Sequence, residues 1–190
     1  MHDFITVLLL GLMLSFSSYA GSAQGIEVDK STGIVSWKTG AHGVSFSLTQ
    51  ILPEQARAFY VNRGFTLQQS EAFATSCVYM TVMRNDSAPG TIHFKRSNWS
   101  VRVNNKAHKL KSVDAWVDSL KQQKVKQSAL IAFRWAQFPV EQEYESGGDW
   151  NQGMLSLGLP AGSKFDLTAR WDIEGEKYET TLRGVQCARK

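Results

Sequence analysis

Apolar and polar residues alternate regularly near the C-terminal end of the chain. From Ser163 to Ile173 every second residue is apolar, and the positions between are charged or polar. A period of two over this length is typical of a β-strand with one buried face. Glu174-Gly175-Glu176 then supplies a turn, and the alternation resumes until Gly184, beyond which it slips by one residue. The pattern predicts a β-hairpin with a bulge at Arg183-Gly184.

Shorter apolar segments earlier in the chain are separated by turn residues. They lie at residues 44–48, 77–84, 92–94, 99–103 and 155–159. The segment from Ala129 to Phe138 is apolar on both faces apart from Arg134 and Gln137, which predicts a central strand covered on each side. Trp116, Trp135 and Trp171 lie on apolar faces of the predicted elements, and we expect them in the core.

Two segments are predicted to be helical. Ser112 can cap a helix whose apolar residues recur at i, i+3, i+4 and i+7 between Val113 and Leu120. A second helix is predicted to begin at Pro53 and to end at Gly64, where a left-handed residue can stop it. We expect both helices to cover a sheet edge or one end of the β structure.

These elements predict a mainly β fold in which residues 24–190 form a single domain, with no repeat or linker dividing it. One cysteine lies in a middle strand and the other in the last strand. This arrangement resembles an immunoglobulin-like β-sandwich at the level of architecture. We therefore expect such a sandwich, or a related barrel, with two short covering helices.

Residues 1–23 have the pattern of a secretory signal peptide. The run from Phe4 to Phe16 is almost wholly apolar, and small residues follow it up to Ala23. This run is shorter than the roughly 20 helical residues that span a hydrocarbon core. Cleavage is expected after Ala20 or Ala23. Because no basic residue precedes the apolar run, a mis-assigned start or a retained anchor are the alternatives.

The two cysteines agree with export. In an oxidising compartment two thiols are expected to pair, so we predict a disulfide between Cys77 and Cys187, with two buried free thiols as the alternative. A short precursor with one cysteine pair is typical of a bacterial envelope protein. We predict a periplasmic protein, with secretion into the medium as the alternative.

Positive charge is concentrated in the middle of the chain. Between Thr91 and Lys126 there are nine Lys and Arg residues and two acidic residues, whereas the whole chain has a net charge of +4. The candidate docking residues in this stretch are Lys106, Lys109, Lys111, Lys121 and Lys124. Such a segment suits an anionic partner or, peripherally, an anionic membrane surface, and nucleic acid is not expected outside the cytoplasm. A solvated face is the alternative.

Trp150 has no periodic apolar partner. It lies among glycines and polar residues, and an aromatic side chain in a polar loop is typical of a binding surface. Asp149, Trp150 and Asn151 are therefore candidate binding residues. The alternative is that Trp150 is a structural plug at one end of the sandwich.

Four soft side chains suggest a metal site. Met80, Met83, His93 and Met154 offer thioether and imidazole ligands, which suit Cu(I) in an exported protein. Because Met80 and Met83 face opposite sides of an extended strand, core packing is the alternative for both. His93 has the pattern of an exposed strand residue.

Catalytic motifs are absent from the sequence. No Gly-x-Ser-x-Gly, His-Glu-x-x-His or Walker sequence occurs, so we predict no enzyme. The expected function is a non-enzymatic binding or accessory domain that docks an envelope protein or other anionic partner through surface loops and the basic segment. A periplasmic copper-binding or chaperone protein is the alternative. A hydrolase that uses Glu141, Glu143 and Glu145, which share one face of an extended segment, comes third.

Overall fold

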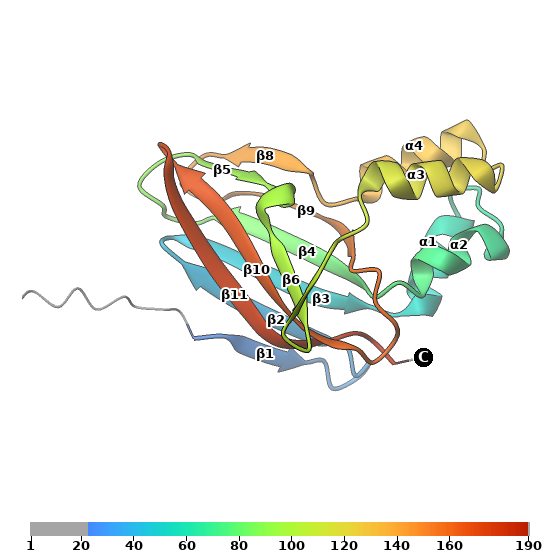
Figure 1. Ribbon diagram of the computed structural model, residues 1–190, viewed down its shortest axis with the longest axis horizontal. Helices are drawn as coiled ribbons and strands as arrows, with labels where there is room; N and C mark the ends of the chain where they lie inside the picture. The colour runs from blue at the N-terminus through green and yellow to red at the C-terminus, as the bar shows by residue number, and fades with distance from the viewer. Residues whose placement is uncertain (1–22, 190) are drawn as a thin grey trace, which may run out of the picture.

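The computed structural model describes residues 23–189. Residues 1–22 of the predicted signal peptide lie outside the described residues. The described chain forms two antiparallel β-sheets in a sandwich-like arrangement, with four α-helices gathered at one end (Figure 1). The prediction of a mainly β fold is confirmed at this level.

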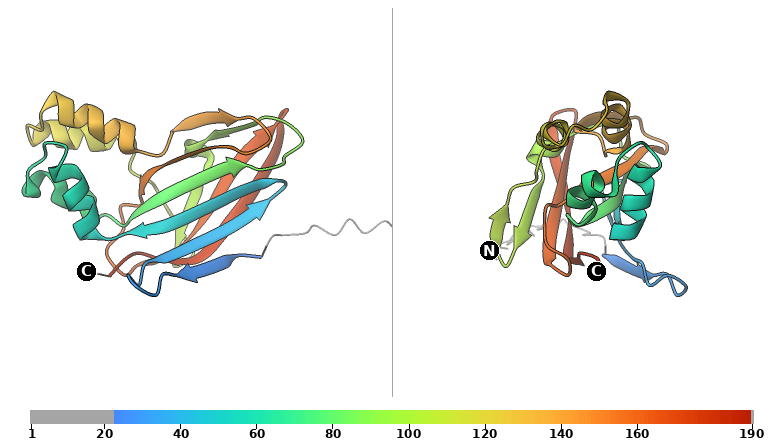
Figure 2. Two further views of the ribbon diagram at one scale, coloured as in Figure 1. Left: turned by 180° about the vertical axis from the view of Figure 1, so that it is seen from behind. Right: turned by 90° about the vertical axis from the view of Figure 1, so that its right-hand side faces the viewer.

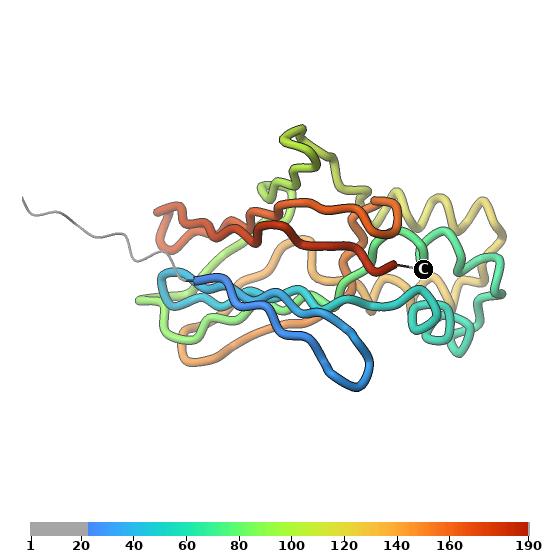
Figure 3. The backbone as a smooth tube through the Cα atoms, turned by 90° about the horizontal axis from the view of Figure 1, so that it is seen from below, coloured from blue at the N-terminus to red at the C-terminus, as the bar shows by residue number. Residues whose placement is uncertain are grey.

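The first sheet has the strand order β1-β2-β3-β4-β9. Its strands are β1 (Gly25–Val28), β2 (Val35–Ala41), β3 (Val44–Ile51), β4 (Val78–Asn85) and β9 (Asp149–Ser156). The second sheet has the order β7-β6-β10-β5-β8, with β11 also paired to β10. Its strands are β5 (Ile92–Lys95), β6 (Ser100–Val103), β7 (Lys106–His108), β8 (Glu141–Tyr144), β10 (Lys164–Ile173) and β11 (Glu176–Gln186). Seen from below, β10 and β11 lie in one layer and β2 and β3 in the other (Figure 3).

The hairpin predicted from the alternating pattern is β10 and β11. Leu167 is paired with Leu182, but Phe165 is paired with Val185, so the register shifts opposite Arg183-Gly184. Gly184 has a φ of 61° and donates its backbone N–H to Asp166 Oδ1 at 2.8 Å. The predicted bulge is therefore confirmed, and a left-handed residue forms it.

Aromatic side chains fill the space between the sheets. Tyr79 on β4 contacts Trp37 of its own sheet and Phe165 of the opposite sheet, with ring centroids 6.2 and 5.7 Å away. Its hydroxyl donates to the carbonyl oxygen of Gln186 at 2.6 Å, and burial raises the pKa of the Tyr79 phenol. Tyr79 thus joins the two sheets through both packing and a hydrogen bond.

The predicted disulfide is present and also joins the two sheets. Cys77 directly precedes β4, and Cys187 directly follows β11; their Cα atoms lie 5.2 Å apart. Both cysteines are buried. The covalent link therefore fixes the ends of two strands that belong to different sheets.

The helices form two pairs, each inserted between two strands. The first pair is α1 (Pro53–Val61) and α2 (Leu67–Ala74), between β3 and β4; the second is α3 (Val113–Gln122) and α4 (Gln127–Ala136), between β7 and β8. Both predicted helices are present, and Ser112 Oγ accepts the backbone N–H of Ala115 as a cap. The expected number of two helices is wrong, because each predicted helix is followed by a second one (Figure 2).

The two helix pairs have the same connection, 60 positions apart. Gly64 and Lys124 both have a positive φ, of 91° and 58°. The next residue in each pair, Phe65 or Val125, is buried and donates its N–H to a carbonyl five residues earlier, at 3.2 Å in both cases. The sequence shows no repeat because the two pairs share the pattern of burial rather than residue identity.

The segment from Ala129 to Phe138 is mostly helix α4, so the expected central strand is wrong. Ala129, Leu130 and Phe133 pack into the helical core. Ile131 and Trp135 lie one turn apart on the outside and are 48% and 86% exposed. Because its outer face carries apolar residues, the helix lacks the polar stripe by which a surface helix is recognised.

Two of the three tryptophans expected in the core are found there. Trp116 and Trp171 are 7% and 2% exposed. Trp135 is the exception and lies at the surface, next to the C-terminal end of α4.

Candidate functional site

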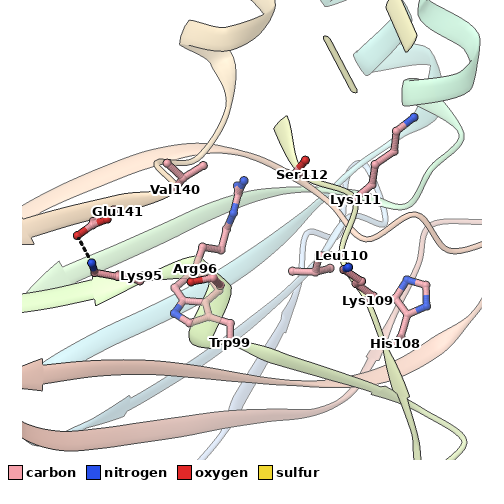
Figure 4. A pocket seen from close by; sticks show the side chains of 11 residues that line it. Lys95, Arg96, Trp99, His108, Lys109, Leu110, Lys111, Ser112, Val140 and Glu141 are labelled. Carbon is pink, nitrogen blue, oxygen red and sulfur yellow. Dashed lines mark ion pairs between the residues drawn. The ribbon is translucent and has the colours of Figure 1, made fainter. Parts of the chain in front are cut away.

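A pocket of about 480 Å³ lies where β5 ends and the chain crosses toward β6 (Figure 4). We call it the basic pocket; it is lined by Lys95, Arg96, Ser97, Trp99, His108, Lys109, Leu110, Lys111, Ser112, Val140 and Glu141. These residues come from the end of β5, from the short 3₁₀ helix η1 (Arg96–Asn98), from the connection between β7 and α3, and from the start of β8. Its volume is within the range of about 300–1,000 Å³ for small-molecule sites.

The wall of the pocket at η1 lies beside β10, which has two partners along one edge. Residues 166–168 of β10 pair with β6 and residues 172–173 pair with β5, so η1 lies opposite the stretch between them. Arg170, in that stretch, donates to the carbonyl oxygen of Asn98 at 2.7 Å and to Ser100 Oγ at 3.2 Å. In return, Trp99 Nε1 donates to the carbonyl oxygen of Arg170 at 3.0 Å. These bonds fix η1 and the indole of Trp99.

Part of the pocket lining is apolar. Trp99 is 7% exposed, and its ring lies 5.2 to 5.6 Å from the rings of Phe46, Phe94 and Phe138. Leu110 packs against the same core, and Val140 is 57% exposed. A ligand in the pocket would therefore contact apolar side chains as well as charged ones.

The single carboxylate in the pocket is already paired. Glu141 lies 2.9 Å from Lys95 Nζ and 2.8 Å from His93 Nε2. The hydrogen bond from Lys95, and after it the one from His93, lowers the pKa of Glu141. The negative charge of Glu141 is thus compensated by Lys95, and His93 is a second hydrogen-bond partner.

Arg96 is a partly buried cation without an acidic partner. Among residues 23–189 no carboxylate oxygen lies within 4.0 Å of its guanidinium, and burial lowers its pKa. Nη1 donates to the carbonyl oxygen of Phe138 at 3.0 Å, which leaves other N–H groups of the guanidinium free to bind a ligand. In Figure 4 the Arg96 side chain stands between Val140 and Ser112.

Lys111 and Lys109 differ in how they are held. Lys111 Nζ lies 3.9 Å from the centre of the Trp116 ring and donates to Ser119 Oγ at 2.8 Å, so it points toward the helices. Lys109 is exposed and has no ion pair among the described residues. The N-terminus of α3 begins at the pocket wall and adds partial positive charge.

The basic segment is only partly gathered at the pocket. Lys109 and Lys111, predicted from the sequence, line it. Lys106 lies at the start of β7. Lys121 lies in the last turn of α3, about 13 Å along the helix from Ser112, and Lys124 lies in the turn that follows. Lys121 is 3.5 Å from Asp118. The five lysines therefore do not form one face.

Sequence reasoning missed Lys95, Arg96 and Trp99 as site residues. The two cations belong to the basic stretch, but nothing in the sequence separates them from its other members. Trp99, Val101 and Val103 occupy alternate positions, and this pattern predicts that Trp99 is an ordinary strand residue. A polar interruption between two short strands, at Ser97-Asn98, was the available signal for a break in the sheet edge.

Trp150 lies in a strand rather than in a loop, so that expectation is wrong. It is in edge strand β9 opposite Arg84 and is 49% exposed. Asp149 holds the preceding turn: its carboxylate accepts the backbone N–H groups of Trp150 at 2.8 Å and Glu145 at 3.2 Å. Asn151 lines a separate hollow beside α4.

The four candidate copper ligands are divided among three places. Met80 and Met154 are directly opposite each other on β4 and β9, where Tyr60 Oη donates to Met154 Sδ at 3.4 Å. Met83 is fully buried on the other face of β4, and His93 lies in the second sheet between Glu141 and Asp172. Within residues 23–189 no group of three His, Cys, Asp or Glu side chains is placed to hold a metal ion.

Glu141 and Glu143 lie in β8, and Glu145 follows it. Glu143 is paired in register with His93, and all three glutamates are exposed. Glu141 alone belongs to the basic pocket.

Comparison with protein-family models, with curated proteins and with solved structures finds no match to this chain. Over the described residues, no helix has the length and apolar character needed to cross a membrane.

Proposed function

We propose that this protein is a non-enzymatic accessory protein of the cell envelope that docks an acidic, partly apolar segment of another envelope protein in the basic pocket. The observation that carries the proposal is Arg96, a partly buried guanidinium with no carboxylate partner among the described residues, beside an apolar wall. Removing a cation from water costs free energy that a carboxylate partner offsets. A bound acidic side chain would supply that partner.

The shape of the pocket favours a side chain over a flat charged surface. Trp99 and Leu110 supply apolar lining, and Arg96 and Lys109 supply cations of the same pocket. An acidic residue next to an aromatic or aliphatic residue would satisfy both parts at once. A bilayer surface would contact only the exposed cations.

Export is part of the proposal. The disulfide between Cys77 and Cys187 supports a non-reducing compartment, because such bonds persist outside the cytoplasm. Within that class of location we propose the periplasm, with secretion into the medium as the alternative.

The test uses a fluorescent peptide in which Glu alternates with Phe, and a second peptide with Gln in place of Glu. We expect fluorescence anisotropy to show saturable binding of the acidic peptide alone. The variant Arg96→Gln should bind it about tenfold or more weakly, because interface Arg residues paired to carboxylates often dominate affinity. Equal binding of both peptides, or an unchanged affinity in Arg96→Gln, would contradict the proposal.

Copper handling is supported by one contact only, the pairing of Met80 with Met154 across two strands. Met154 is 4% exposed, and its sulfur already accepts a hydrogen bond from Tyr60. Equilibrium dialysis against Cu(I) tests this alternative. Stoichiometric binding that is lost in Met80→Leu would favour it over the docking proposal.

A further inference from the structure

Trp135 is the most exposed large apolar side chain of the described residues, at 86%. A tryptophan in a protein core buries roughly 150–250 Å² of surface, so the fold gains almost none of that stabilisation here. The residue lies at the C-terminal end of α4, whose opposite face already packs into the helical core. Since packing does not account for Trp135, its open indole face is available to a ligand.

A hollow of about 320 Å³ lies beside Trp135. It is lined by Arg134, Trp135, Gln137, Pro139, Asn151 and Gln152. One wall is the end of α4 and the chain that follows it, and the other is edge strand β9. We call this feature the Trp135 hollow.

The two walls are held together by the backbone. Phe138 N donates to the carbonyl oxygen of Met154 at 2.9 Å. A Cβ atom on Gly153 would lie 2.4 Å from Phe138 N, so only glycine allows this approach. The hollow is therefore formed in the folded chain before any ligand binds.

The polar groups of the hollow are mostly amides rather than charges. Asn151 and Gln152 each offer a carbonyl acceptor and an NH₂ donor. Arg134 is the single charged residue, and its Nη1 lies 2.9 Å from Asp114 Oδ1, which compensates it. The Trp135 hollow thus differs from the basic pocket, where the charge of Arg96 is uncompensated.

We propose that the Trp135 hollow binds a neutral oligosaccharide, with the C–H face of one pyranose ring stacked on Trp135 and its hydroxyls bonded to one side-chain amide of edge strand β9. That amide is Asn151 or Gln152, because consecutive residues of a strand face opposite sides of the sheet. A pyranose ring has an apolar face and a rim of hydroxyls that both donate and accept. An exposed indole beside side-chain amides matches both features. The absence of an uncompensated charge among the lining residues favours a neutral ligand over an anion.

The proposal is tested by titrating the full mature protein with cellotetraose and with the tetramer of N-acetylglucosamine, followed by calorimetry and tryptophan fluorescence. We expect saturable binding of at least one of them. Trp135→Ala should weaken it about tenfold or more, which corresponds to about 1.4 kcal/mol. Trp135→Phe should retain part of the affinity because a smaller aromatic face remains.

Two variants serve as controls. Leu67→Ala removes another exposed apolar side chain, 67% exposed on α2, and should leave sugar binding unchanged. Arg96→Gln should also leave it unchanged, which separates this site from the basic pocket. Circular dichroism checks that each variant is folded, as expected for changes at exposed positions.

Three outcomes would overturn the proposal. One is that neither tetrasaccharide binds to the native protein at millimolar concentration. Another is that Trp135→Ala binds sugar as the native protein does. The third is a concentration-dependent dimer in sedimentation that Trp135→Ala abolishes, since a second copy of the chain would then be the occupant.

Discussion

Arg96 Nη1 donates a hydrogen bond of 3.0 Å to the carbonyl oxygen of Phe138, and so links η1 to the chain that leads from α4 into β8. The bond adds stability, but burying the guanidinium without a carboxylate costs free energy. These two effects oppose each other. A residue kept at such a cost is typical of a functional site.

We therefore expect Arg96→Met to abolish binding of the acidic peptide without destabilising the fold. Met retains the unbranched apolar part of the side chain and removes the buried charge. The free energy of unfolding in urea should stay within about 1 kcal/mol of the native value, or rise. A loss of more than about 2 kcal/mol would show that Arg96 has a structural role instead.

Lys109→Glu should weaken binding of the acidic peptide, whereas Lys124→Glu should not. Lys109 lines the basic pocket, and Lys124 lies in the turn between α3 and α4. Reversing an exposed charge at a binding site mainly slows association, here by roughly threefold to tenfold at low salt. Stopped-flow measurement at low and at physiological ionic strength provides the check, because salt should reduce the difference. Equal effects of the two variants would mean that net charge, rather than the pocket, attracts the peptide.

Gly153→Ala should destabilise the protein by about 1–3 kcal/mol or more, as overpacking against a fixed backbone does. Its Cβ would lie 2.4 to 2.5 Å from backbone atoms of Gln137 and Phe138. Gly25→Ala is the matched control, since nothing lies within 4 Å of that position. Its effect should stay within about 0.5 kcal/mol. Urea denaturation measures both, and sugar binding to Gly153→Ala should fall because the Trp135 hollow changes shape.

Removing the disulfide should lower the free energy of unfolding by up to about 4–5 kcal/mol in the chain-entropy model, because the bond closes a loop of 110 residues. The comparison is between the native protein and Cys77→Ala/Cys187→Ala in urea. Non-reduced peptide mapping of the exported protein should recover Cys77 and Cys187 in one linked pair. Free thiols in the native protein, or equal stability of the double variant, would contradict the assignment.

The turn between β1 and β2 should weaken in acid. Hydrogen bonds from the Ser31 side chain, and then from the backbone of Thr32, lower the pKa of Asp29 from 3.8 to about 2. A carboxyl group whose pKa is lower in the folded state than in the unfolded state stabilises the folded protein at pH values above its ordinary pKa. That contribution is lost as pH falls through the folded value. Stability should therefore decline between pH 4 and pH 2, and Asp29→Asn should lack this part of the decline.

Ser31→Ala provides the control for Asp29. It removes the first of these hydrogen bonds, so the pKa of Asp29 should rise toward its ordinary value. Titration of the side-chain carboxyl by NMR measures this directly. An unchanged pKa in Ser31→Ala would show that another group lowers it.

The elements predicted correctly are those determined by neighbouring residues. The alternation from Ser163 to Ile173 is a strand, and the slip at Gly184 is a bulge. Ser112 caps α3, and Pro53 begins α1. These features depend on backbone conformation and on burial within one element, so the sequence carries them locally. The two sheets are arranged like a sandwich, and the closer resemblance to an immunoglobulin-like sandwich stays a prediction.

The errors have one physical cause at α4 and another at β9. Ile131 and Trp135 are apolar residues on the outer face of α4. The sequence of this helix therefore lacks the contrast between an apolar buried side and a polar exposed side. Trp150 was assigned to a loop because its neighbours are glycine, Asp and Asn, yet β9 pairs with β4 over its whole length. At β9, pairing with the neighbouring strand outweighs the local preference of these residues for a loop.

The sequence alone determined the β character of the chain, its hairpin, two of its helices, the cysteine pair and the concentration of cations. Only the tertiary structure brought Arg96, Lys109 and Val140 to one pocket, and Trp135 beside Asn151. It also left Lys121 and Lys124 away from that pocket. The physical reason is that each site is built across strands and helices distant along the chain. Their juxtaposition depends on strand order and on how the helix pairs pack, which no local pattern encodes.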